Sequence, residues 1–449
     1  MLKVHSAAGH SLTSLPTAKL KGVIRVPGDK SISHRALMFG GLAIGETVIT
    51  GLLEGEDVLA TAAALRALGC SVSRDDHGQW RVIGLGLGGM AEPETVLDLG
   101  NAGTAARLLM GIVAGHGFVS FMTGDASLCS RPMARVIKPL EQMGARFITR
   151  TRGRLPLAVI GSKTLIPIDY ELPMPSAQVK SAILLAGLFA PGVTTVIEAV
   201  EEYTRDHSEN MLRHFGAKVE TTILSDGRKK ISLTGQPILR AAAVTVPADP
   251  SSAAFPAVAA AMSPGSEVTL QGVGINPLRA GVYQSLRDMG AKITEQNQRT
   301  EGGEPVADLV IQGSQLQGVT VPANRAPSMI DEYPVLAMAA ATAQGTTRLL
   351  GLSELRVKES DRLAAVATGL EQCGVKLEVQ GDDLIIHGQG LPVTGGATIT
   401  TNLDHRIAMS FLVLGMRSER PITVDDASPI ETSFPGFAHL MNQIGAKIE

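Results

Sequence analysis

The chain has 449 residues, more than one hydrophobic core usually supports, so two or three domains are expected. It carries 40 Lys and Arg residues against 43 Asp and Glu, and a formal net charge of -3 gives no support to general binding of nucleic acid or membrane surfaces. Because only 3% of the residues are aromatic, the core must be built mainly from Ala, Leu, Val, Ile and Met.

The cysteines and the N-terminal sequence both favour a cytoplasmic protein. Cys70, Cys129 and Cys373 are an odd number without metal-ligand spacing, which fits a reducing compartment. The first twenty residues hold no apolar stretch with a small-residue cleavage site after it, so no secretory signal is indicated. Apolar runs such as residues 182–190 are shorter than the roughly 20 residues that a membrane span requires.

One pattern recurs six times along the chain, with one extra residue in its last copy: L-x-x-φ-G-[ACV]-x-φ, where φ is an apolar residue. Each copy predicts an amphipathic helix, a glycine that caps it in the left-handed conformation, and the start of a strand. The repetition predicts a sixfold fold, most simply two groups of three. In chain order the six glycines are Gly69, Gly144, Gly216, Gly290, Gly374 and Gly445.

Six further segments are apolar nearly all round, which is typical of helices in a protein interior. Three in each half of the chain would form a buried helical core, wrapped by the outer amphipathic helices and the strands. In chain order these predicted helices are residues 34–43, 104–115, 178–190, 252–262, 332–343 and 406–416.

Polar residues are concentrated at the starts of these buried helices. Ordinary N-capping accounts for the Ser, Thr, Asn and Asp residues there, but not for Lys30, Gln178, His405 and Arg406. A cation is unfavourable beside the positive end of a helix dipole, so Lys30 and Arg406 suggest a bound anion. If the three helices of each half run parallel, their N-termini converge on one face, and two such faces would form an anion-binding cleft.

Two charged segments leave a structural and a functional interpretation open. Residues 354–366 place one carboxylate, Glu359, among three cations, either as a salt-bridged helix start or as a site that holds a dianion while Glu359 moves a proton. Asp331, at the start of a buried helix, is either a cap or a general base.

Taken in order, six motifs resemble those of the enolpyruvyl transferases, in particular the branch that acts on shikimate 3-phosphate. The resemblance extends from about Lys21 to Ile448. The motifs are PGDKSISHRAL, LGNAGTAARL, RPM, SAQVKSA, RVKESDRL and DHRIAM.

The resemblance implies an inside-out α/β fold of two similar domains, each with three β-α-β-α-β-β repeats around buried parallel helices. The first domain is expected over residues 25–246, and the second over residues 1–24 plus 247–449, with the active-site cleft between them.

The implied reaction moves the enolpyruvyl group of phosphoenolpyruvate to the 5-hydroxyl of shikimate 3-phosphate and releases phosphate. It belongs to the shikimate pathway, which leads to chorismate and the aromatic amino acids. The resemblance implies no metal or organic cofactor, no partner besides these two small substrates, and a monomer.

Residue roles are carried over at the matching positions. The expected catalytic residues are Lys30, Asp331 and Glu359. The expected contacts to shikimate 3-phosphate are Lys30, Ser31, Arg35, Ser176, Ala177, Gln178, Arg205, Asp331 and Lys358. The expected contacts to phosphoenolpyruvate are Lys30, Asn101, Gly103, Arg131, Gln178, Arg362 and Arg406.

Three positions depart from the commoner pattern of this branch. Ala177 replaces a second serine, Leu108 replaces a proline, and Glu431 stands where a C-terminal lysine is usual. These features resemble a divergent second class that often has alanine at the position of Gly103 and tolerates the herbicide glyphosate. Gly103 leaves this space open, so glyphosate is expected to fit, although Leu108 could shift the helix and reduce its affinity.

Two other functions are weighed against this one. An enolpyruvyl transferase acting on UDP-N-acetylglucosamine should have its cysteine several residues before an Arg-Pro pair, whereas Cys129 lies two residues before Arg131. A noncatalytic protein that binds a phosphorylated metabolite would have no need of carboxylates beside its anionic ligand.

Overall fold

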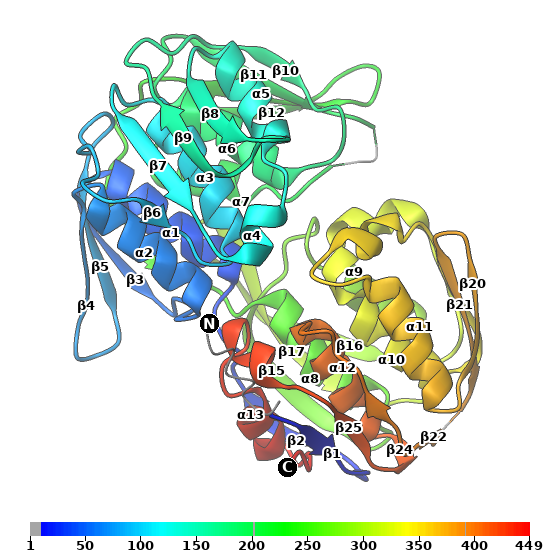
Figure 1. Cartoon of the computed structure of the whole chain (residues 1–449). Coiled ribbons are helices and arrows are strands. Elements are labelled where there is room, and N and C mark those ends of the chain that lie inside the picture. The colour runs from blue at the N-terminus through cyan, green and yellow to red at the C-terminus, as the bar shows by residue number, and fades with distance from the viewer. Residues whose placement is uncertain (1–9, 201–202, 391) are drawn as a thin grey trace, which may run out of the picture. The chain divides into compact units, whose positions relative to one another are not determined.

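The chain folds into two compact units, which we describe in turn from a computed structural model that covers residues 10–200, 203–390 and 392–449 (Figure 1). The central unit comprises Gly28–Pro247 and Thr300–Pro305, and the terminal unit comprises Met1–Pro27, Ala248–Arg299 and Val306–Glu449. Residues 1–9, which belong to the segment predicted to lack a secretory signal, lie outside the described residues.

The central unit contains three four-stranded sheets, with strand orders β14-β3-β5-β4, β6-β7-β9-β8 and β10-β11-β13-β12. Its helices are α1 (Lys30–Leu42), α2 (Glu56–Ala67), α3 (Gly103–Ala114), α4 (Ala126–Ser130), α5 (Ala134–Gln142), α6 (Ala177–Gly187) and α7 (His207–His214). Its strands are β3 (Ile44–Thr50), β4 (Ser71–Arg74), β5 (Trp80–Leu85), β6 (Leu97–Asp98), β7 (Val119–Thr123), β8 (Arg146–Arg150), β9 (Arg154–Ile160), β10 (Asp169–Glu171), β11 (Val193–Glu198), β12 (Val219–Ile223), β13 (Lys229–Thr234) and β14 (Val244–Thr245).

The terminal unit repeats this plan with sheets β16-β17-β15-β2, β18-β19-β21-β20 and β1-β25-β23, and a short pair β22-β24. Its α-helices are α8 (Pro250–Ala261), α9 (Gly281–Asp288), α10 (Tyr333–Thr342), α11 (Arg362–Gln372), α12 (His405–Gly415) and α13 (Phe437–Gln443), and its 3₁₀ helices are η1 (Ala323–Ser328), η2 (Ile330–Glu332), η3 (Ser353–Val357) and η4 (Ser428–Thr432). Its strands are β1 (Leu12–Ser14), β2 (Lys21–Ile24), β15 (Glu267–Gly274), β16 (Lys292–Glu301), β17 (Glu304–Gln312), β18 (Thr320–Val321), β19 (Gln344–Leu349), β20 (Lys376–Gln380), β21 (Asp383–Gln389), β22 (Val393–Gly395), β23 (Thr398–Ile399), β24 (Ser418–Arg420) and β25 (Ile422–Val424).

One sheet in each unit is completed by a strand from a distant part of the sequence. In the central unit, β14 lies parallel to β3, with Val244 opposite Ile49. In the terminal unit, β2 lies parallel to β15, with Lys21 opposite Glu267. The three repeats of each unit are therefore bound together by its own first and last segments.

Both ends of the described chain lie in the same sheet region of the terminal unit. Strand β1 pairs antiparallel with β25, with Leu12 opposite Val424. Thr13 also exchanges two backbone hydrogen bonds with Glu449, at N···O distances of 2.7 and 2.9 Å. The sheet that holds the N-terminal strand thus also holds residue 449.

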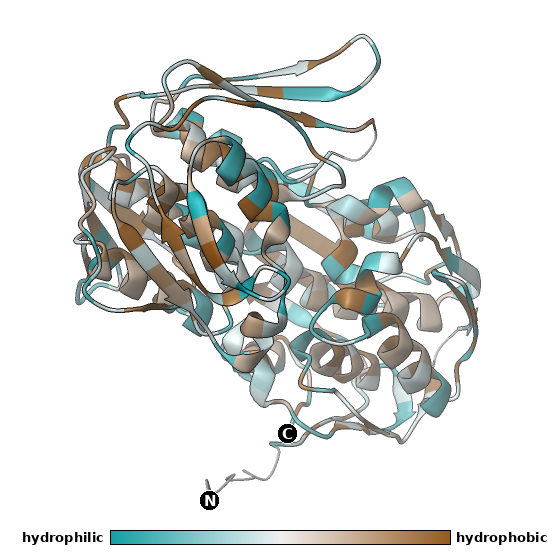
Figure 2. Ribbon diagram, turned by 45° about the horizontal axis from the view of Figure 1, so that its top comes forward, coloured by the Kyte–Doolittle hydropathy of each residue, from teal (hydrophilic) through white to brown (hydrophobic). Residues whose placement is uncertain are grey.

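The six predicted interior helices are confirmed as α1, α3, α6, α8, α10 and α12. They are buried along nearly their whole lengths, and every residue of α8 is buried. Hydrophobic segments run through the interior helices of both units (Figure 2). Helix α8 shows why a sequence so rich in Ala forms a helix here: Ala has the highest helix propensity, Pro250 stands at the first turn, and the Asp249 carboxylate accepts a hydrogen bond from the N–H of Ser251.

The glycine pattern is confirmed, although one of the six predicted strands is absent from the described residues. All six repeat glycines have positive φ, from 82° at Gly374 to 110° at Gly144, and each stands just after the end of a helix. A named strand begins after each of the first five. After Gly445 no named strand follows, but residues 447–449 pair with β1 through the Ser14–Ile448 bridge and a backbone hydrogen bond from Leu15 to Lys447. This short segment pairs with β1 as β12 pairs with β13 in the equivalent sheet of the central unit.

Within the described ranges, no helix is both long enough and apolar enough to cross a membrane.

Candidate active site

In the central unit, the first turns of α3 and α6 lie side by side. The Arg107 guanidinium donates to the Gln178 side-chain oxygen at 2.9 Å, and the Gln178 amide donates to Thr104 Oγ1 at 3.1 Å. One turn further along α6, Ser181 Oγ accepts a hydrogen bond from Arg35 of α1 at 2.8 Å. The three buried helices therefore run in the same direction, and their N-termini meet on one face of the central unit.

The loop before α3 holds a second part of this face. Arg131 donates to the Asn101 side-chain oxygen at 2.6 Å, and the Asn101 amide donates to Asp125 at 2.7 Å. The other Asp125 oxygen caps α4 by accepting the N–H of Leu128. Arg131 directly follows the last residue of α4, and α5 begins three residues later. The predicted pair Asn101 and Arg131 is thus brought together by direct contact.

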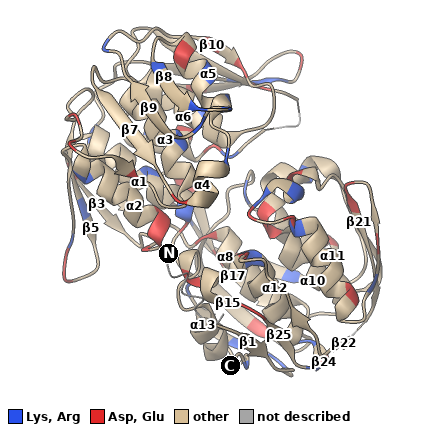
Figure 3. Cartoon of the chain, in the orientation of Figure 1, with Lys and Arg blue, Asp and Glu red and all other residues tan. Residues whose placement is uncertain are grey.

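Gly103 is the first residue of α3, and two guanidinium groups lie beside it. A methyl group in place of its hydrogen would stand 3.0 Å from an Nη atom of Arg107 and 3.0 Å from one of Arg131. Burial and the charges of Arg131 and Arg135 lower the pKa of Arg107 to about 10. The predicted glycine therefore lies against two guanidinium groups at the start of α3; Figure 3 shows the Lys and Arg residues of both units in blue.

Arg35, a predicted contact to shikimate 3-phosphate, lies deep in the central unit. Its guanidinium is buried and bonds to Ser208, Ser181 and the backbone oxygen of Ser31, all at 2.8 to 2.9 Å. Burial lowers its pKa to about 10, and the nearby charge of Arg205 acts in the same direction. Ser31 is therefore held beside Arg35 by its backbone, and Arg205 lies close enough to act on the charge of Arg35.

The other predicted residues of the central unit stand at helix starts. Lys30 begins α1 and forms an ion pair with Asp57 at 3.2 Å, with its side chain 30% exposed. Ser176 caps α6 by accepting the N–H of Val179, and Ala177 is the first residue of that helix. Arg205 lies half-buried, two residues before α7 begins.

The segment that carries Arg205 is anchored by a buried ion cluster. Lys180 is fully buried and lies 2.8 Å from a Glu209 oxygen and 3.2 Å from a Glu198 oxygen. It also donates to the backbone oxygen of Thr204 at 3.2 Å. Burial lowers the pKa of Lys180, but the two glutamates outweigh that effect and raise it above its usual value. Lys180 is therefore committed to holding residue 204 in place, next to Arg205.

In the terminal unit, the predicted residues converge on Arg362. This guanidinium is 1% exposed and bonds to three carboxylates: Asp404 at 2.8 Å, Asp331 at 3.2 Å and Glu359 at 2.5 Å. Lys358 reaches the same Asp331 oxygen at 3.3 Å. The two acid-base candidates, Asp331 and Glu359, are thus brought together on one buried cation.

The charges of this cluster shift the pKa values of Arg362 and Glu359. Burial lowers the pKa of Arg362, but Glu359, Asp404 and Asp331 outweigh burial and raise it above its usual value. Desolvation raises the pKa of Glu359, but the charges of Arg362 and His405 outweigh desolvation and lower it to about 2. Glu359 is therefore ionised at neutral pH, and its partly exposed carboxylate can accept a proton.

Arg406 is held in place by a buried network of charged and polar side chains at the starts of α8, α10 and α12. Its guanidinium donates to the backbone oxygen of Asp331 at 3.0 Å and lies 3.5 Å from a Glu332 oxygen. The same Glu332 oxygen lies 3.2 Å from Arg279 and accepts a short hydrogen bond from Ser251. Glu332 and Arg279 are 1% and 4% exposed. The N-termini of the three buried helices are thus joined by one chain of charges.

The predicted site residues did not include Arg107, Arg279, Glu332 and Asp404, although Glu332 and Asp404 stand at the starts of predicted buried helices. Arg107 stands in the segment LGNAGTAARL and Asp404 in DHRIAM, so attention to the neighbours of the chosen residues would have found both. Arg279 had no such signal, because it lies in a loop outside the motifs and is brought to Asp249, Ser251 and Glu332 only by the fold. Glu431, at the position of the usual C-terminal lysine, accepts a hydrogen bond from the N–H of Gly436 at 3.2 Å and so stabilises its own loop.

These two faces, with basic residues at the starts of buried helices and carboxylates set against them, are those of a transferase acting on anionic substrates. The structures of EPSP synthase from Acinetobacter baumannii share the fold: two of them superpose with a TM-score of 0.90, at 47% and 46% identity, and cover 98% of this chain and 99% of theirs. The predicted inside-out α/β fold of two similar domains is confirmed.

The comparisons with sequences agree with the structural one. The family model of EPSP synthase (3-phosphoshikimate 1-carboxyvinyltransferase) matches residues 15–441. The enzyme of that name from Paramagnetospirillum magneticum is 62% identical, covering 97% of this chain and 98% of its own, and that from Rhodospirillum rubrum is 61% identical, covering 96% of both. This chain belongs to the EPSP synthase family.

Replacing Glu332 by Gln tests the buried network, because it removes a charge shared by Arg279 and Arg406 while keeping the size of the side chain. We expect the free energy of unfolding of the terminal unit to fall by about 3 kcal/mol, since breaking a buried ion pair leaves its partner charged and desolvated. Urea unfolding monitored by circular dichroism measures the loss. The matched control is Glu371→Gln, an exposed residue of α11, which should change the value by less than about 0.5 kcal/mol. Equal effects of the two substitutions would contradict the network.

Proposed function

We propose that this chain transfers the enolpyruvyl group of phosphoenolpyruvate to the 5-hydroxyl of shikimate 3-phosphate and releases phosphate. The relatives of this chain are named 3-phosphoshikimate 1-carboxyvinyltransferase, and that name describes this reaction. The observation that carries the proposal is the convergence of Asp331 and Glu359 on Arg362, which sets two proton acceptors against an anion-binding guanidinium. The reaction serves the shikimate pathway to chorismate and the aromatic amino acids.

We assign the carboxylate and phosphate of phosphoenolpyruvate to Lys30, Gln178 and three arginines. Arg131, Arg362 and Arg406 suit this task because guanidinium groups bind these anions through two parallel hydrogen bonds. Arg107 supports the assignment as an additional cation, since it lies against Gly103 and bonds to Gln178. Asn101 orients Arg131 by accepting its hydrogen bond.

We assign shikimate 3-phosphate to Lys30, Arg35, Gln178, Arg205 and Lys358. The remaining contacts assigned to it are Ser31, Ser176, Ala177 and Asp331. Arg35 and Ser31 are mutually fixed, and Arg205 acts on the charge of Arg35, so these three form one basic group within the central unit.

The chemical steps balance as an addition and a subsequent elimination. Carbon 3 of phosphoenolpyruvate takes a proton, and the 5-hydroxyl oxygen, losing its proton to Asp331, forms a bond to carbon 2. The tetrahedral adduct then loses a proton from carbon 3 together with phosphate, which restores the double bond. Glu359 exchanges the proton at carbon 3, and Lys30 delivers a proton to the departing phosphate.

The ion pair of Glu359 explains how one carboxylate can take part in both proton transfers at carbon 3. With its pKa near 2, Glu359 is a poor donor while Arg362 holds it. A substrate carboxylate that binds Arg362 competes for the same guanidinium and adds a negative charge nearby, and both effects raise the pKa of Glu359. Substrate binding therefore prepares the acid form that the addition step requires.

We further propose that the protein is a cytoplasmic monomer. The odd cysteine count supports a reducing compartment: Cys70 and Cys373 are buried, and desolvation raises their thiol pKa values to about 11 and 12. Thiols in this state form neither disulfides nor reactive thiolates readily.

Phosphate release from phosphoenolpyruvate tests the proposed reaction. Purified protein is assayed with shikimate 3-phosphate and, in parallel, with UDP-N-acetylglucosamine. We expect release with shikimate 3-phosphate alone, because the basic groups assigned to it match one phosphate and one carboxylate. Release with the UDP-sugar alone would assign the rival transferase activity, and release with neither would leave a binding protein.

Replacing Glu359 by Gln separates catalysis from binding. Loss of the proton acceptor should lower kcat by roughly 10² to 10⁴, the usual range for a general acid or base, while the Kd for shikimate 3-phosphate changes only a few-fold. Stopped-flow turnover and calorimetric binding measure the two quantities. Glu354→Gln, an exposed glutamate five residues earlier, is the matched control and should keep both. Full turnover by the Glu359 variant would remove Glu359 from the mechanism.

Replacing Gly103 by Ala tests whether glyphosate occupies the phosphoenolpyruvate residues. The added methyl group presses on Arg107 and Arg131, so we expect the inhibition constant of glyphosate to rise about tenfold or more, the cost of overpacking a tight site. The KM for phosphoenolpyruvate should rise less, since it is the smaller ligand, and the KM for shikimate 3-phosphate should stay unchanged. Steady-state inhibition measures these constants, and identical inhibition of both proteins would contradict the steric argument.

A further inference from the structure

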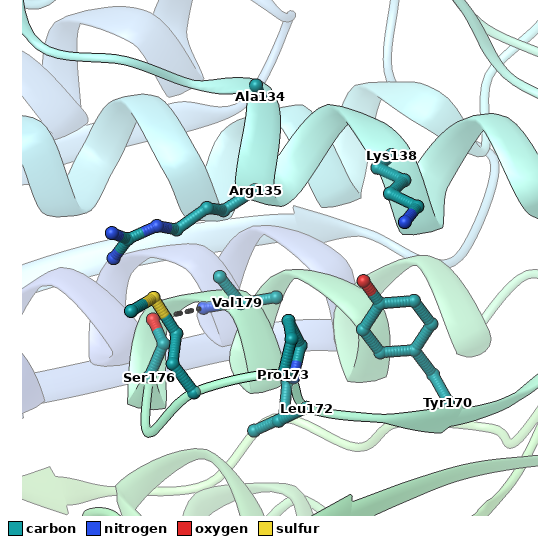
Figure 4. A pocket seen from close by; sticks show the side chains of 9 residues that line it. Ala134, Arg135, Lys138, Tyr170, Leu172, Pro173, Ser176 and Val179 are labelled. Carbon is teal, nitrogen blue, oxygen red and sulfur yellow. Dashed lines mark hydrogen bonds between the residues drawn. The ribbon is translucent and has the colours of Figure 1, made fainter.

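A pocket in the central unit lies beside the residues already assigned but is not formed by them. Its volume is about 250 Å³, and its walls come from α5, β10 and the loop that leads into α6 (Figure 4). Arg135 and Lys138 stand on the α5 side, and Tyr170 lies across from Lys138. Ser176 is the one lining residue that also appears among the proposed substrate contacts.

The two cations of this pocket differ from the cations of the active site. Arg107, Arg131 and Lys30 each contact an oxygen of a neighbouring side chain. Arg135 and Lys138 are exposed, lie three residues apart on one face of α5, and have no hydrogen bond or ion pair to any residue that the structure describes. Two unpaired cations that line the same hollow are suited to hold an anion from solution.

The opposite wall of the pocket is apolar. Leu172 and Met174 line it, and the ring of Tyr170 presents an aromatic surface with a hydroxyl at its edge. Desolvation raises the pKa of Tyr170, so its hydroxyl keeps its proton and can donate a hydrogen bond. A wholly polar ion such as phosphate would leave this wall uncovered, whereas a ring with one anionic group would cover it.

We propose that this pocket binds a small ring-bearing carboxylate, with the carboxylate on the α5 wall that carries Arg135 and Lys138 and the ring against Tyr170, Leu172 and Met174. The pocket is smaller than the 300 to 1,000 Å³, approximately, of typical drug-sized sites, which restricts the ligand to about one ring. A carboxylate suits Arg135 because its planar fork matches that geometry.

An occupant of the pocket would act on the substrate residues through the start of α6. Ser176 lines the pocket and caps α6, and Gln178 of the first turn bonds to Arg107. A ligand that contacts residues 172–176 would therefore shift the side chain of Gln178 without blocking the substrate residues themselves. The ligand is a modulator of affinity for shikimate 3-phosphate, and not a competitor for it.

Calorimetric titration with 4-hydroxybenzoate tests the site, with 4-hydroxybenzamide as the uncharged control ligand. We expect one molecule bound per chain, and at least tenfold weaker binding of the amide. Lys138→Met and Arg135→Gln should each weaken the carboxylate about tenfold or more, the usual effect of a lost charge-assisted hydrogen bond. Arg146→Gln, an exposed arginine at the start of β8 outside the pocket, is the matched control and should bind as the unchanged protein does. No binding at millimolar concentrations, or equal affinity in all variants, would overturn the proposal.

Titration at rising concentrations of shikimate 3-phosphate separates the pocket from the substrate residues. For a distinct but coupled site, the apparent Kd of 4-hydroxybenzoate changes and then reaches a plateau. An apparent Kd that rises in proportion to shikimate 3-phosphate would place the probe on the substrate residues and overturn the proposal. The comparison of variants needs no substrate, so its result does not depend on the reaction proposed above.

Discussion

The constraint on which this structure depends is the burial of helix N-termini. Six helices without a polar face must lie in the interior, and the first N–H groups of each helix have no partner within it. Side chains that accept hydrogen bonds therefore cap four of the six starts, whereas α3 and α10 begin without a side-chain cap hydrogen bond in the described structure. Asp29, Asp249 and Asp404 do this as side-chain caps, and Ser176 does it for α6. Packing three such helices in parallel gathers these polar groups on one face of each unit.

The gathered carboxylates in turn explain the buried arginines. An ionised carboxylate in a protein interior is costly unless a cation and hydrogen bonds accompany it. Arg362 forms ion pairs with three carboxylates and Arg279 with two, and both guanidinium groups are almost completely buried. The requirement for structural charge balance and the requirement for anion recognition are therefore met by neighbouring groups. Arg362 belongs to both sets, because one of its carboxylate partners, Glu359, lies at the surface where a ligand can replace it.

Local features of the fold could be predicted from the sequence, and long-range ones could not. The glycine caps and the interior helices depend on spacing and hydropathy within about ten residues, and both lie at the expected positions. The sixth repeat segment has its partner, β1, more than 400 residues away in the sequence, so no local pattern could predict this pairing. Likewise, the motifs identified Arg362, Asp331 and Glu359, but the network of Arg279 and Glu332 joins residues 53 apart and has no periodic signal.

The position of Arg35 shows a different limit of sequence reasoning. Its motif predicts Arg35 as a contact to shikimate 3-phosphate but does not say how deeply its side chain lies. In the fold its guanidinium turns inward to Ser181 and Ser208 because α6 and α7 offer hydroxyl groups there. Spacing on a helix gives the face on which a side chain lies, but the partners on neighbouring helices decide how deep it lies.

The pairing of β1 and residue 449 in one sheet has a consequence for the order of events during synthesis. Nearly all of the central unit is a continuous stretch, so its core can assemble while the remainder is still being translated. The terminal unit has to wait: β1 and β2 emerge first but find their partners β25 and β15 only later, and Thr13 meets Glu449 only when residue 449 has left the ribosome. Until those partners are synthesised, β1 and β2 have exposed backbone hydrogen-bonding groups that could pair with the wrong strands.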